Sequence, residues 1–188
     1  MKPMITDFNG RSGSIPTASI QWDSSWPGLA GEDDRQRILS YLEDRFGISR
    51  TCFADYLLLR KKKSWFLIRR TVFLAYASRL KVSQVGLRAF QMVAGFVKPT
   101  TRFIQSFGRF ATKGKLHVTL EQLHALVKGE KIEVDIRLEN GYVILTLDHD
   151  RVPGLGLYIN GVISSQLPKK EIRGTMLDGN MKHVGIEY

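Results

Sequence analysis

The sequence predicts an α+β fold, with a helix and a β-hairpin in the N-terminal half and a small mixed β-barrel in the C-terminal half. Three observations carry this prediction. An amphipathic helical pattern covers residues 34–46, two apolar runs flank the basic residues 60–63, and four short strand patterns follow residue 130. The chain has 188 residues, 43% of them hydrophobic and 24% charged, which is typical of a folded protein of one domain, or of one domain with a smaller partner.

Residues 1–31 are rich in Gly, Ser, Pro and Thr and have no periodic pattern, so we expect an extended N-terminal arm. Trp22 and Trp26 are large apolar side chains for such an arm. We therefore expect part of the arm to pack against the body of the protein.

The first helix is predicted to begin at Asp33 and Asp34, because acidic residues stabilise a helix N-terminus. Gly47 is the expected C-terminal cap, since glycine adopts the left-handed conformation that ends many helices. The apolar face of this helix carries Ile38, Leu39, Leu42 and Phe46.

Residues 56–59 and 64–68 are apolar runs on either side of Arg60-Lys61-Lys62-Lys63, which predicts a β-hairpin with a basic tip. The next apolar segment, residues 72–76, fits both a strand and the start of a helix. Its period leaves both possibilities open.

A second helix is predicted to start at Pro99, because proline suits the first helical position. Arg102 and Arg109 are expected to point outward from it. Phe107 and Phe110 are candidates for base stacking, although their helical spacing favours a place in the core. The other side chains that we expect this helix to bury are Phe103 and Ile104.

The C-terminal half begins with a short strand at residues 116–118. Thr119-Leu-Glu-Gln122 then has the spacing of a capping box, and the helix that follows is expected to end at Gly129. Asn160-Gly161 is a strong signal for a two-residue hairpin turn. Short strands at this spacing predict a mixed or antiparallel barrel with one helix across its end. The four strands that we expect after this helix are residues 131–138, 142–147, 156–159 and 162–166.

The excess of positive over negative charge comes from one stretch of the chain. The formal net charge is +10, and residues 55–113 hold thirteen basic residues with a single acid, Asp55. A solvated surface usually mixes both signs, so this stretch predicts a patch for a polyanion, with nucleic acid favoured over an anionic membrane surface. The predicted helices lack the sharply divided basic and apolar faces of membrane-surface helices, which argues against a membrane partner.

From about residue 86 onward, the order of short motifs resembles the PUA domain, an RNA-binding module. It is most similar to the PUA-like domain that ends the RsmF-type (NOL/NOP/Sun class) ribosomal RNA cytosine methyltransferases. The motifs are Gly-Phe-Val-Lys-Pro-Thr at 95–100, Val-Thr-Leu-Glu at 118–121, Val-Lys-Gly-Glu at 127–130, Gly-Tyr-Val-Ile-Leu at 141–145, Val-Pro-Gly-Leu-Gly at 152–156, Asn-Gly-Val at 160–162 and Leu-Pro-Lys at 167–169. The sequence departs from that group at Leu157, where the group has a basic residue, and at residues 165–169.

A second resemblance covers more of the chain. The Nip-family pre-ribosomal RNA processing proteins pair an N-terminal pre-PUA domain with a C-terminal PUA domain. The segments that are similar to theirs are residues 34–46, 56–68 and 107–119.

These resemblances imply an N-terminal α/β pre-PUA domain followed by a small PUA-like mixed β-barrel with one or two helices. The expected divisions are an arm at 1–31, the pre-PUA domain at 32–94, the PUA-like domain at 95–175 and a C-terminal tail at 176–188. The implied function is non-catalytic binding of structured ribosomal or transfer RNA, in ribosome biogenesis, rRNA processing or RNA modification. Shape, rather than base sequence, is expected to dominate such recognition.

The candidate RNA-binding residues fall into three groups. Cations on and after the predicted helix supply phosphate contacts, and two glycines either let a backbone approach the RNA or simply bend a strand. The third group follows the family's Pro-Lys end. In chain order the candidates are Lys98, Arg102, Arg109, Lys113, Lys115, Gly154, Gly156, Lys169, Lys170 and Arg173.

Patterns for catalysis are weak, so we expect a non-enzyme with no cofactor and no metal. Thr51-Cys52 matches the dipeptide that holds the catalytic cysteine of the methyltransferase class, but no Gly-x-Gly-x-x-Gly cofactor motif accompanies it. The four histidines have no metal-ligand spacing, and one cysteine forms no internal disulfide.

An alternative function is a protein–protein scaffold, or an RNA-targeting subunit for a separate RNA methyltransferase or ribosome assembly factor. In this hypothesis the arm, with Ile20, Trp22 and Trp26, docks on the partner. A cytoplasmic location is expected for either function, since the sequence start lacks a secretory pattern and no apolar run is long enough for a membrane span.

Overall fold

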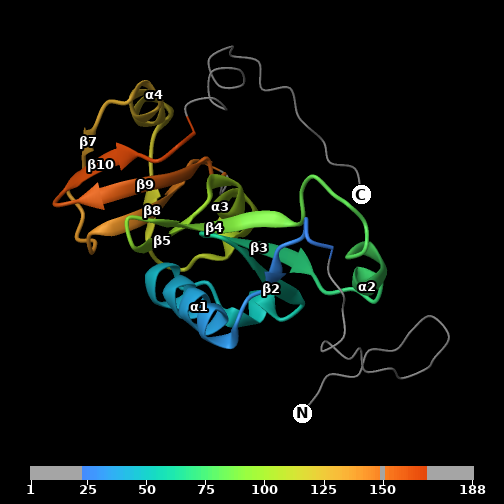
Figure 1. Ribbon diagram of the computed structural model, residues 1–188. Coiled ribbons are helices and arrows are strands. Elements are labelled where there is room, and N and C mark those ends of the chain that lie inside the picture. Colours follow the sequence, from blue (N-terminus) through green and yellow to red (C-terminus); the bar gives the residue numbers. More distant parts are fainter. Residues whose placement is uncertain (1–22, 149–150, 169–188) are drawn as a thin grey trace.

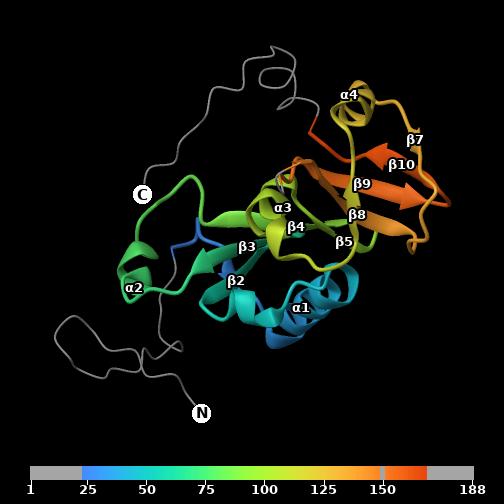
Figure 2. The same ribbon diagram turned by 180° about the vertical axis from the view of Figure 1, so that it is seen from behind.

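The described residues, 23–148 and 151–168 of the computed structural model, form two five-stranded sheets that share a hydrophobic core (Figure 1, Figure 2). The order of strands is β1-β2-β3-β4-β5 in the first sheet and β6-β8-β9-β10-β7 in the second. The second sheet curls into a half-barrel, and the mixture of helix and sheet agrees with the predicted α+β class.

The first sheet is antiparallel throughout. Its strands are β1 (Gly28–Leu29), β2 (Tyr56–Lys61), β3 (Ser64–Arg69), β4 (Leu87–Val93) and β5 (Phe96–Pro99). Strands β2 and β3 form the predicted hairpin, and its basic tip includes Lys62 with a positive φ of 54°.

Helix α1 (Glu32–Phe46) covers the front face of this sheet. Three acidic residues occupy its first turn, as the helix dipole favours, and Gly47 ends it with φ 64°. The apolar face predicted from the sequence is buried against the sheet.

The back face of the first sheet, which faces away from α1, is partly covered by the short helix α2 (Leu74–Ala77) and by Trp26, which precedes β1. Residues 72–76 thus contribute to a helix rather than a strand. Trp26 is only 8% exposed, and its Nε1–H donates to the Leu80 carbonyl at 2.8 Å. This confirms that part of the N-terminal arm packs down, whereas Trp22 and Ile20 lie outside the described residues.

The prediction that a helix starts at Pro99 is wrong. Pro99 is the last residue of β5 and pairs with Phe90, and helix α3 (Thr101–Phe107) begins after it. The Thr100 hydroxyl accepts a hydrogen bond from the Phe103 N–H at 3.2 Å and so caps the helix. Proline is tolerated in β5 because this is an edge strand, where a missing N–H leaves no neighbour unpaired.

The second sheet follows α3 and a short 3₁₀ turn, η3 (Gly108–Phe110). The predicted capping box is confirmed at Thr119 and Gln122, and the Asn160-Gly161 turn joins β9 to β10 with φ 49° and 85°. The elements are β6 (Lys115–His117), α4 (Leu120–Lys128), β7 (Ile132–Glu133), β8 (Gly141–Thr146), β9 (Gly154–Ile159) and β10 (Val162–Ser165).

The strand predicted at residues 131–138 is much shorter than expected, since only β7 pairs with β10. The Val134 N–H donates to the carbonyl of Gly161, in the turn where the β9–β10 hairpin ends. Residues beyond Val134 therefore extend past their partner strand. Their alternating apolar side chains still pack on the core of this sheet, so the alternation reports burial rather than strand pairing.

The largest core cluster joins both sheets. It contains Ile38 and Leu42 of α1, Phe103 of α3, and Ile144 and Leu155 of the second sheet. The boundary expected between residues 94 and 95 falls inside the β4–β5 hairpin of the first sheet. None of the helices in the described part of the chain is long and apolar enough to cross a membrane.

Candidate nucleic-acid interface

A row of polar side chains, here called the polar row, crosses the back face of the first sheet. The strand register places Lys61 opposite Ser64, Ser64 opposite Gln91, and Gln91 opposite Lys98. Neighbouring strands lie about 4.8 Å apart, so the Cα atoms of the two lysines at the ends are separated by roughly 14 Å. Both lysines therefore stand on one surface at a spacing fixed by the sheet.

The alternation of side chains along the strands explains why these residues share a face. Leu57 and Leu59 of β2 pack in the cluster with Trp26. Lys61 lies two residues after Leu59 on the same strand, so its side chain is on the same face of the sheet. On β3, Phe66 packs on that cluster and Ser64 shares its face. The covered half of the back face is thus apolar, and the open half carries the polar row.

Arg88 joins this surface because of a β-bulge. The register between β3 and β4 shifts at Trp65 and Phe66, which pairs Phe66 with Arg88 on the back face. One guanidinium nitrogen of Arg88, Nη2, donates to Ser64 Oγ at 2.9 Å and to Gln91 Oε1 at 3.1 Å. Both acceptors are neutral, so these bonds position the guanidinium without cancelling its charge.

Lys98 links the two sheets. Its Nζ donates to Gln166 Oε1 at 2.6 Å and lies 5.6 Å from the centre of the Tyr142 ring. Partial burial lowers the pKa of Lys98, because it disfavours the charged form.

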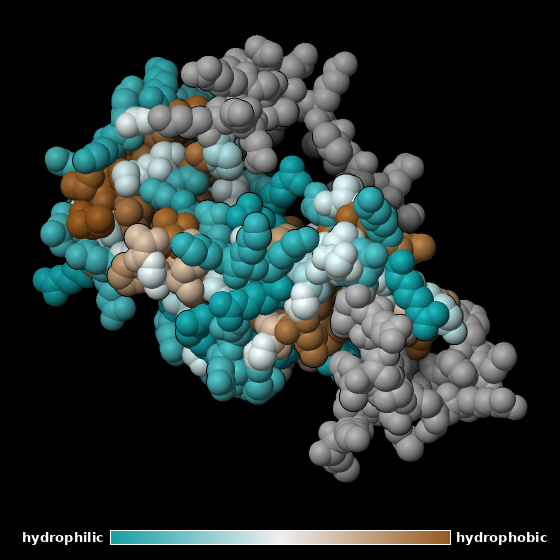
Figure 3. Space-filling model, in the orientation of Figure 1, coloured by the Kyte–Doolittle hydropathy of each residue, from teal (hydrophilic) through white to brown (hydrophobic). Residues whose placement is uncertain are grey.

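A basic groove continues from the polar row. Arg88, Lys98 and Arg102 supply its cations, and no carboxylate is among the described residues that line it. Its full lining is Arg88, Gln91, Lys98, Pro99, Thr100, Thr101, Arg102, Ser165, Gln166, Leu167 and Pro168. In Figure 3, hydrophilic residues cover the middle of the molecule, whereas hydrophobic residues gather at the outer end of β9 and β10.

Two of the residues predicted from the sequence, Lys98 and Arg102, come together in this groove. Arg109, Lys113 and Lys115 are exposed but lie at and beyond the other end of α3, about 10 Å away along the helix. Of these, Arg109 stacks on the Phe110 ring with its Cζ 4.8 Å from the ring centre. We call these three residues the second basic cluster.

The last three predicted cations, Lys169, Lys170 and Arg173, lie outside the described residues. Pro168, which directly precedes Lys169, lines the basic groove.

The two predicted glycines lie in the core. Gly154 and Gly156 are buried, so their backbone is not presented to a ligand. A Cβ on Gly154 would stand near Leu167, and a Cβ on Gly156 would stand 2.9 Å from Ile163 Cγ2. They are glycines because side chains from neighbouring elements fill the space, and we remove them from the set of candidate contacts.

The remaining candidates have structural surroundings. Phe107 is buried, as its helical spacing favoured, while Phe110 is 43% exposed beside Arg109. Cys52 lies in the 3₁₀ turn η2 (Arg50–Phe53), half-buried against the main core. Within the described residues there is no group of three or more His, Cys, Asp or Glu side chains that could hold a metal ion.

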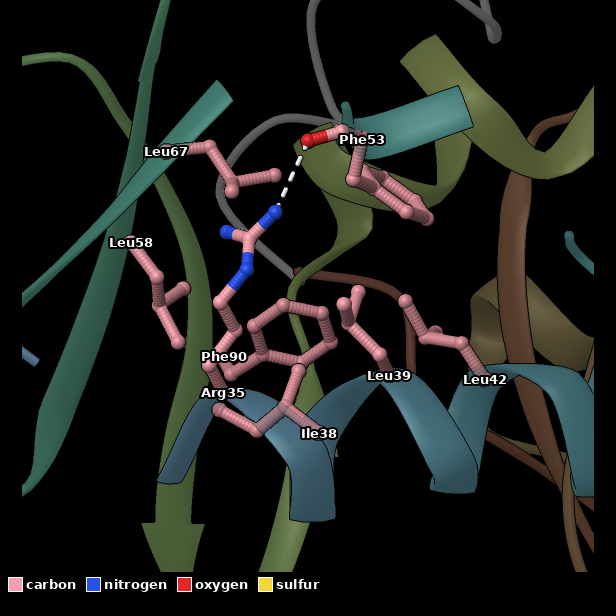
Figure 4. Close-up of a pocket in the computed structure, with 8 residues that line it drawn as sticks. All are labelled: Arg35, Ile38, Leu39, Leu42, Phe53, Leu58, Leu67 and Phe90. Atoms are coloured by element: carbon pink, nitrogen blue, oxygen red, sulfur yellow. Dashed lines mark hydrogen bonds between the residues drawn. The ribbon is translucent and has the colours of Figure 1, made fainter. Parts of the chain in front are cut away.

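A small cavity inside the main core offers no binding site. Seven apolar side chains and Arg35 line it, and the Arg35 guanidinium donates to the carbonyl of Phe53 at 3.0 Å (Figure 4). The same guanidinium also donates to the carbonyl of Tyr56 at 3.1 Å. Arg35 therefore satisfies buried backbone carbonyls and closes the cavity.

Sequence reasoning missed Lys61, Ser64, Arg88 and Gln91 as members of one surface. The alternation along β2 and β3 could have indicated that Lys61 and Ser64 share a face, but the bulge that adds Arg88 has no local signal. No family model matches this chain, and a search of the curated proteins finds no match to it.

Proposed function

We propose that this chain is a non-catalytic, cytoplasmic RNA-binding protein that holds structured ribosomal or transfer RNA on the back face of its first sheet. The proposal includes the architecture implied by the sequence resemblances, a pre-PUA domain joined to a PUA-like barrel, and a place in ribosome biogenesis or RNA modification.

The observation that carries the proposal is the joining of the polar row to the basic groove. Cations from β2, β4, β5 and α3 lie on or beside one continuous surface, and the described lining of the groove contains no carboxylate. Such a surface attracts a polyanion and releases its condensed counterions, which is the main source of affinity for a nucleic-acid backbone.

The type of contact favours RNA shape over base sequence. The polar row offers Ser64 and Gln91 between two lysines, so hydroxyl and amide groups are available for the 2′-hydroxyls that lie between phosphates. The row therefore offers contacts to phosphates and sugars rather than to base edges.

The salt dependence of binding tests this function. Fluorescently labelled total transfer RNA and a ribosomal RNA fragment are titrated with the protein at several salt concentrations. We expect the logarithm of affinity to fall linearly with the logarithm of salt, by about 0.7 for each phosphate neutralised on a single strand. An absence of binding to both RNAs at low salt would refute the proposal.

A charge-reversal variant changes one cation of the basic groove, Arg102, together with one cation of the second basic cluster, Arg109. Arg102→Glu with Arg109→Glu is expected to weaken RNA binding and to leave the melting temperature nearly unchanged, because both side chains are exposed. Unchanged affinity would place the interface elsewhere.

The scaffold function remains a second candidate because of the outer face of the second sheet. Leu157, Ile159 and Val162 lie there side by side, and Ile159 is 49% exposed. Of the arm residues named for docking in the scaffold hypothesis, Trp26 is buried against its own chain and so does not offer its side chain to a partner. Capture of a defined ribosome assembly factor by the wild type but not by Ile159→Asp would favour this candidate.

A further inference from the structure

Helix α2 lies at the end of the molecule opposite α4 (Figure 1, Figure 2), and an exposed group of apolar side chains, here called the apolar knob, stands on and next to it. The knob consists of Phe73, Tyr76 and Leu80. These side chains are 69%, 72% and 61% exposed. The opposite side of α2 packs on the sheet through Leu74 and Ala77, so both sides of this short helix are apolar although only one faces the core.

The backbone of the knob is anchored. The Asp23 N–H donates to the Ser78 carbonyl at 2.8 Å, and the indole N–H of Trp26 donates to the Leu80 carbonyl at 2.8 Å. Leu74 is buried to 3% exposure beneath it. The two rings are therefore presented from a fixed support rather than from a loose loop.

The surroundings of the knob are cationic. Arg69, Arg70, Arg79 and Lys81 flank it, and all four are exposed. Along the chain, the nearest acids are Asp55 before the knob and Glu121 after it. In space, Asp23 is held next to the knob by its hydrogen bond to Ser78, and its carboxylate interacts with Lys81, which leaves the three arginines as the main cations of this surface. This charge pattern complements an anionic partner and disfavours a second copy of the same basic surface.

The knob also lies beside the polar row. Leu74 packs with Leu57 and Leu59, and Ile68 packs on the same cluster, whereas the polar row crosses β3 at Ser64. Four residues of a strand separate Ser64 from Ile68, which is a distance of about 13 Å. An RNA strand that follows the row can reach the knob within a few nucleotides.

We propose that Phe73 and Tyr76 stack on unpaired bases of the RNA whose phosphates lie on the polar row and in the basic groove. This inference rests on the proposed function and adds the class of ligand, a structured RNA with a single-stranded extension. Exposed aromatic rings ringed by cations are the combination that binds single strands without sequence preference, because every base has a face to stack. The flanking arginines hold the phosphates of the same nucleotides.

The experiment compares three RNAs with the wild-type protein. One is a blunt duplex, the second carries a six-nucleotide extension, and the third carries the same extension made of abasic nucleotides, which keeps the phosphates and removes the bases. A stacked base contributes about five-fold or more in affinity, so the base-bearing extension should bind at least about five-fold more tightly than the abasic one. Equal affinity for these two RNAs would overturn the inference.

Variants locate the effect. Phe73→Ala with Tyr76→Ala should abolish the preference for the base-bearing extension and leave binding of the blunt duplex unchanged. Phe96→Ala is the matched control, because Phe96 is also 72% exposed but lies at the β4–β5 turn. A preference that persists in the double variant would place the base contacts elsewhere and overturn the inference.

The outcomes separate this inference from the proposed function. If the blunt duplex binds with a steep salt dependence and the bases add nothing, the proposed function stands and the stacking inference fails. If no RNA binds, both fail. Vesicles of anionic phospholipid are tested in parallel, and binding to them that depends on Phe73 and Tyr76, without any effect of these residues on RNA, would identify the knob as a membrane-surface contact instead.

Discussion

Neutralising two cations of the basic groove gives the sharpest test of where RNA lies. The variant Arg88→Gln with Arg102→Gln removes two positive charges and keeps side chains of polar character at both positions. Both residues are exposed, so the expected loss in the free energy of unfolding is small, within about 0.5 kcal/mol for each. A change in RNA binding would then report on the interface rather than on the fold.

The size of the effect follows from counterion release. If each arginine neutralises one phosphate of a single strand, the slope of log affinity against log salt becomes shallower by about 1.4. The electrostatic contribution vanishes near 1 M salt, so at 0.1 M each contact contributes about 0.7 logarithmic units. The double variant should therefore bind about 25-fold more weakly at 0.1 M salt and nearly as well as the wild type near 1 M.

The assay is fluorescence anisotropy of one labelled RNA at five or more salt concentrations. Lys128→Gln with Arg137→Gln is the control, because it removes the same charge from exposed residues that do not line the groove. Equal losses in the two double variants would mean that net charge, rather than the groove, determines affinity. A loss that is independent of salt would refute phosphate contact as its cause.

Three further predictions concern stability. Trp26→Ala should lower the free energy of unfolding by about 3–5 kcal/mol in a urea titration, because a buried ring is lost, whereas Trp26→Phe should cost less; equal costs would assign the effect to the hydrogen bond with Leu80. Because burial lowers the pKa of Lys98, the unfolded chain binds more protons between the lowered pKa and 10.5, so stability rises with pH in that range. The difference in stability between the wild type and Lys98→Met should increase with pH over this range, since the contribution of the partly buried Tyr41 and Tyr142 is common to both proteins, and parallel curves would contradict this. Gly156→Ala should destabilise the fold by about 1–3 kcal/mol, since its Cβ meets Ile163, without changing RNA affinity; weaker binding at unchanged stability would restore Gly156 as a contact.

The parts of the fold that could be predicted are those whose interactions are local. Gly47 ends α1, Thr119 and Gln122 cap α4, and Asn160-Gly161 turns the last hairpin, and in each case the partner groups lie within a few residues. Helix α3 shows the limit of such signals. Proline suits the first position of a helix and threonine suits its N-cap, so the sequence fits a helix start at Pro99 or after Thr100. The pairing of Pro99 with Phe90 in the sheet decides for the second.

The candidate site was harder to predict because it depends on strand register. The charge of residues 55–113 indicates a polyanion, and Lys98 and Arg102 follow from it. The rest of the surface requires that β2 to β5 be aligned to the residue and that the bulge at Trp65 and Phe66 be known. For Gly154 and Gly156 the sequence leaves both a ligand contact and a bent strand open for a related reason, since only the packed structure shows what occupies the space beside them.

The core shared by the two sheets has a kinetic consequence. Phe103 and Leu155 pack in one cluster and Lys98 bonds to Gln166 across the groove, so core packing and a hydrogen bond hold the two walls of the groove together. An incoming RNA then meets a groove that is already formed, so little conformational entropy of the protein is lost on binding. The association rate should be governed by long-range electrostatic attraction, so it should fall steeply as salt is added. The dissociation rate should vary with the fit of each RNA to the groove.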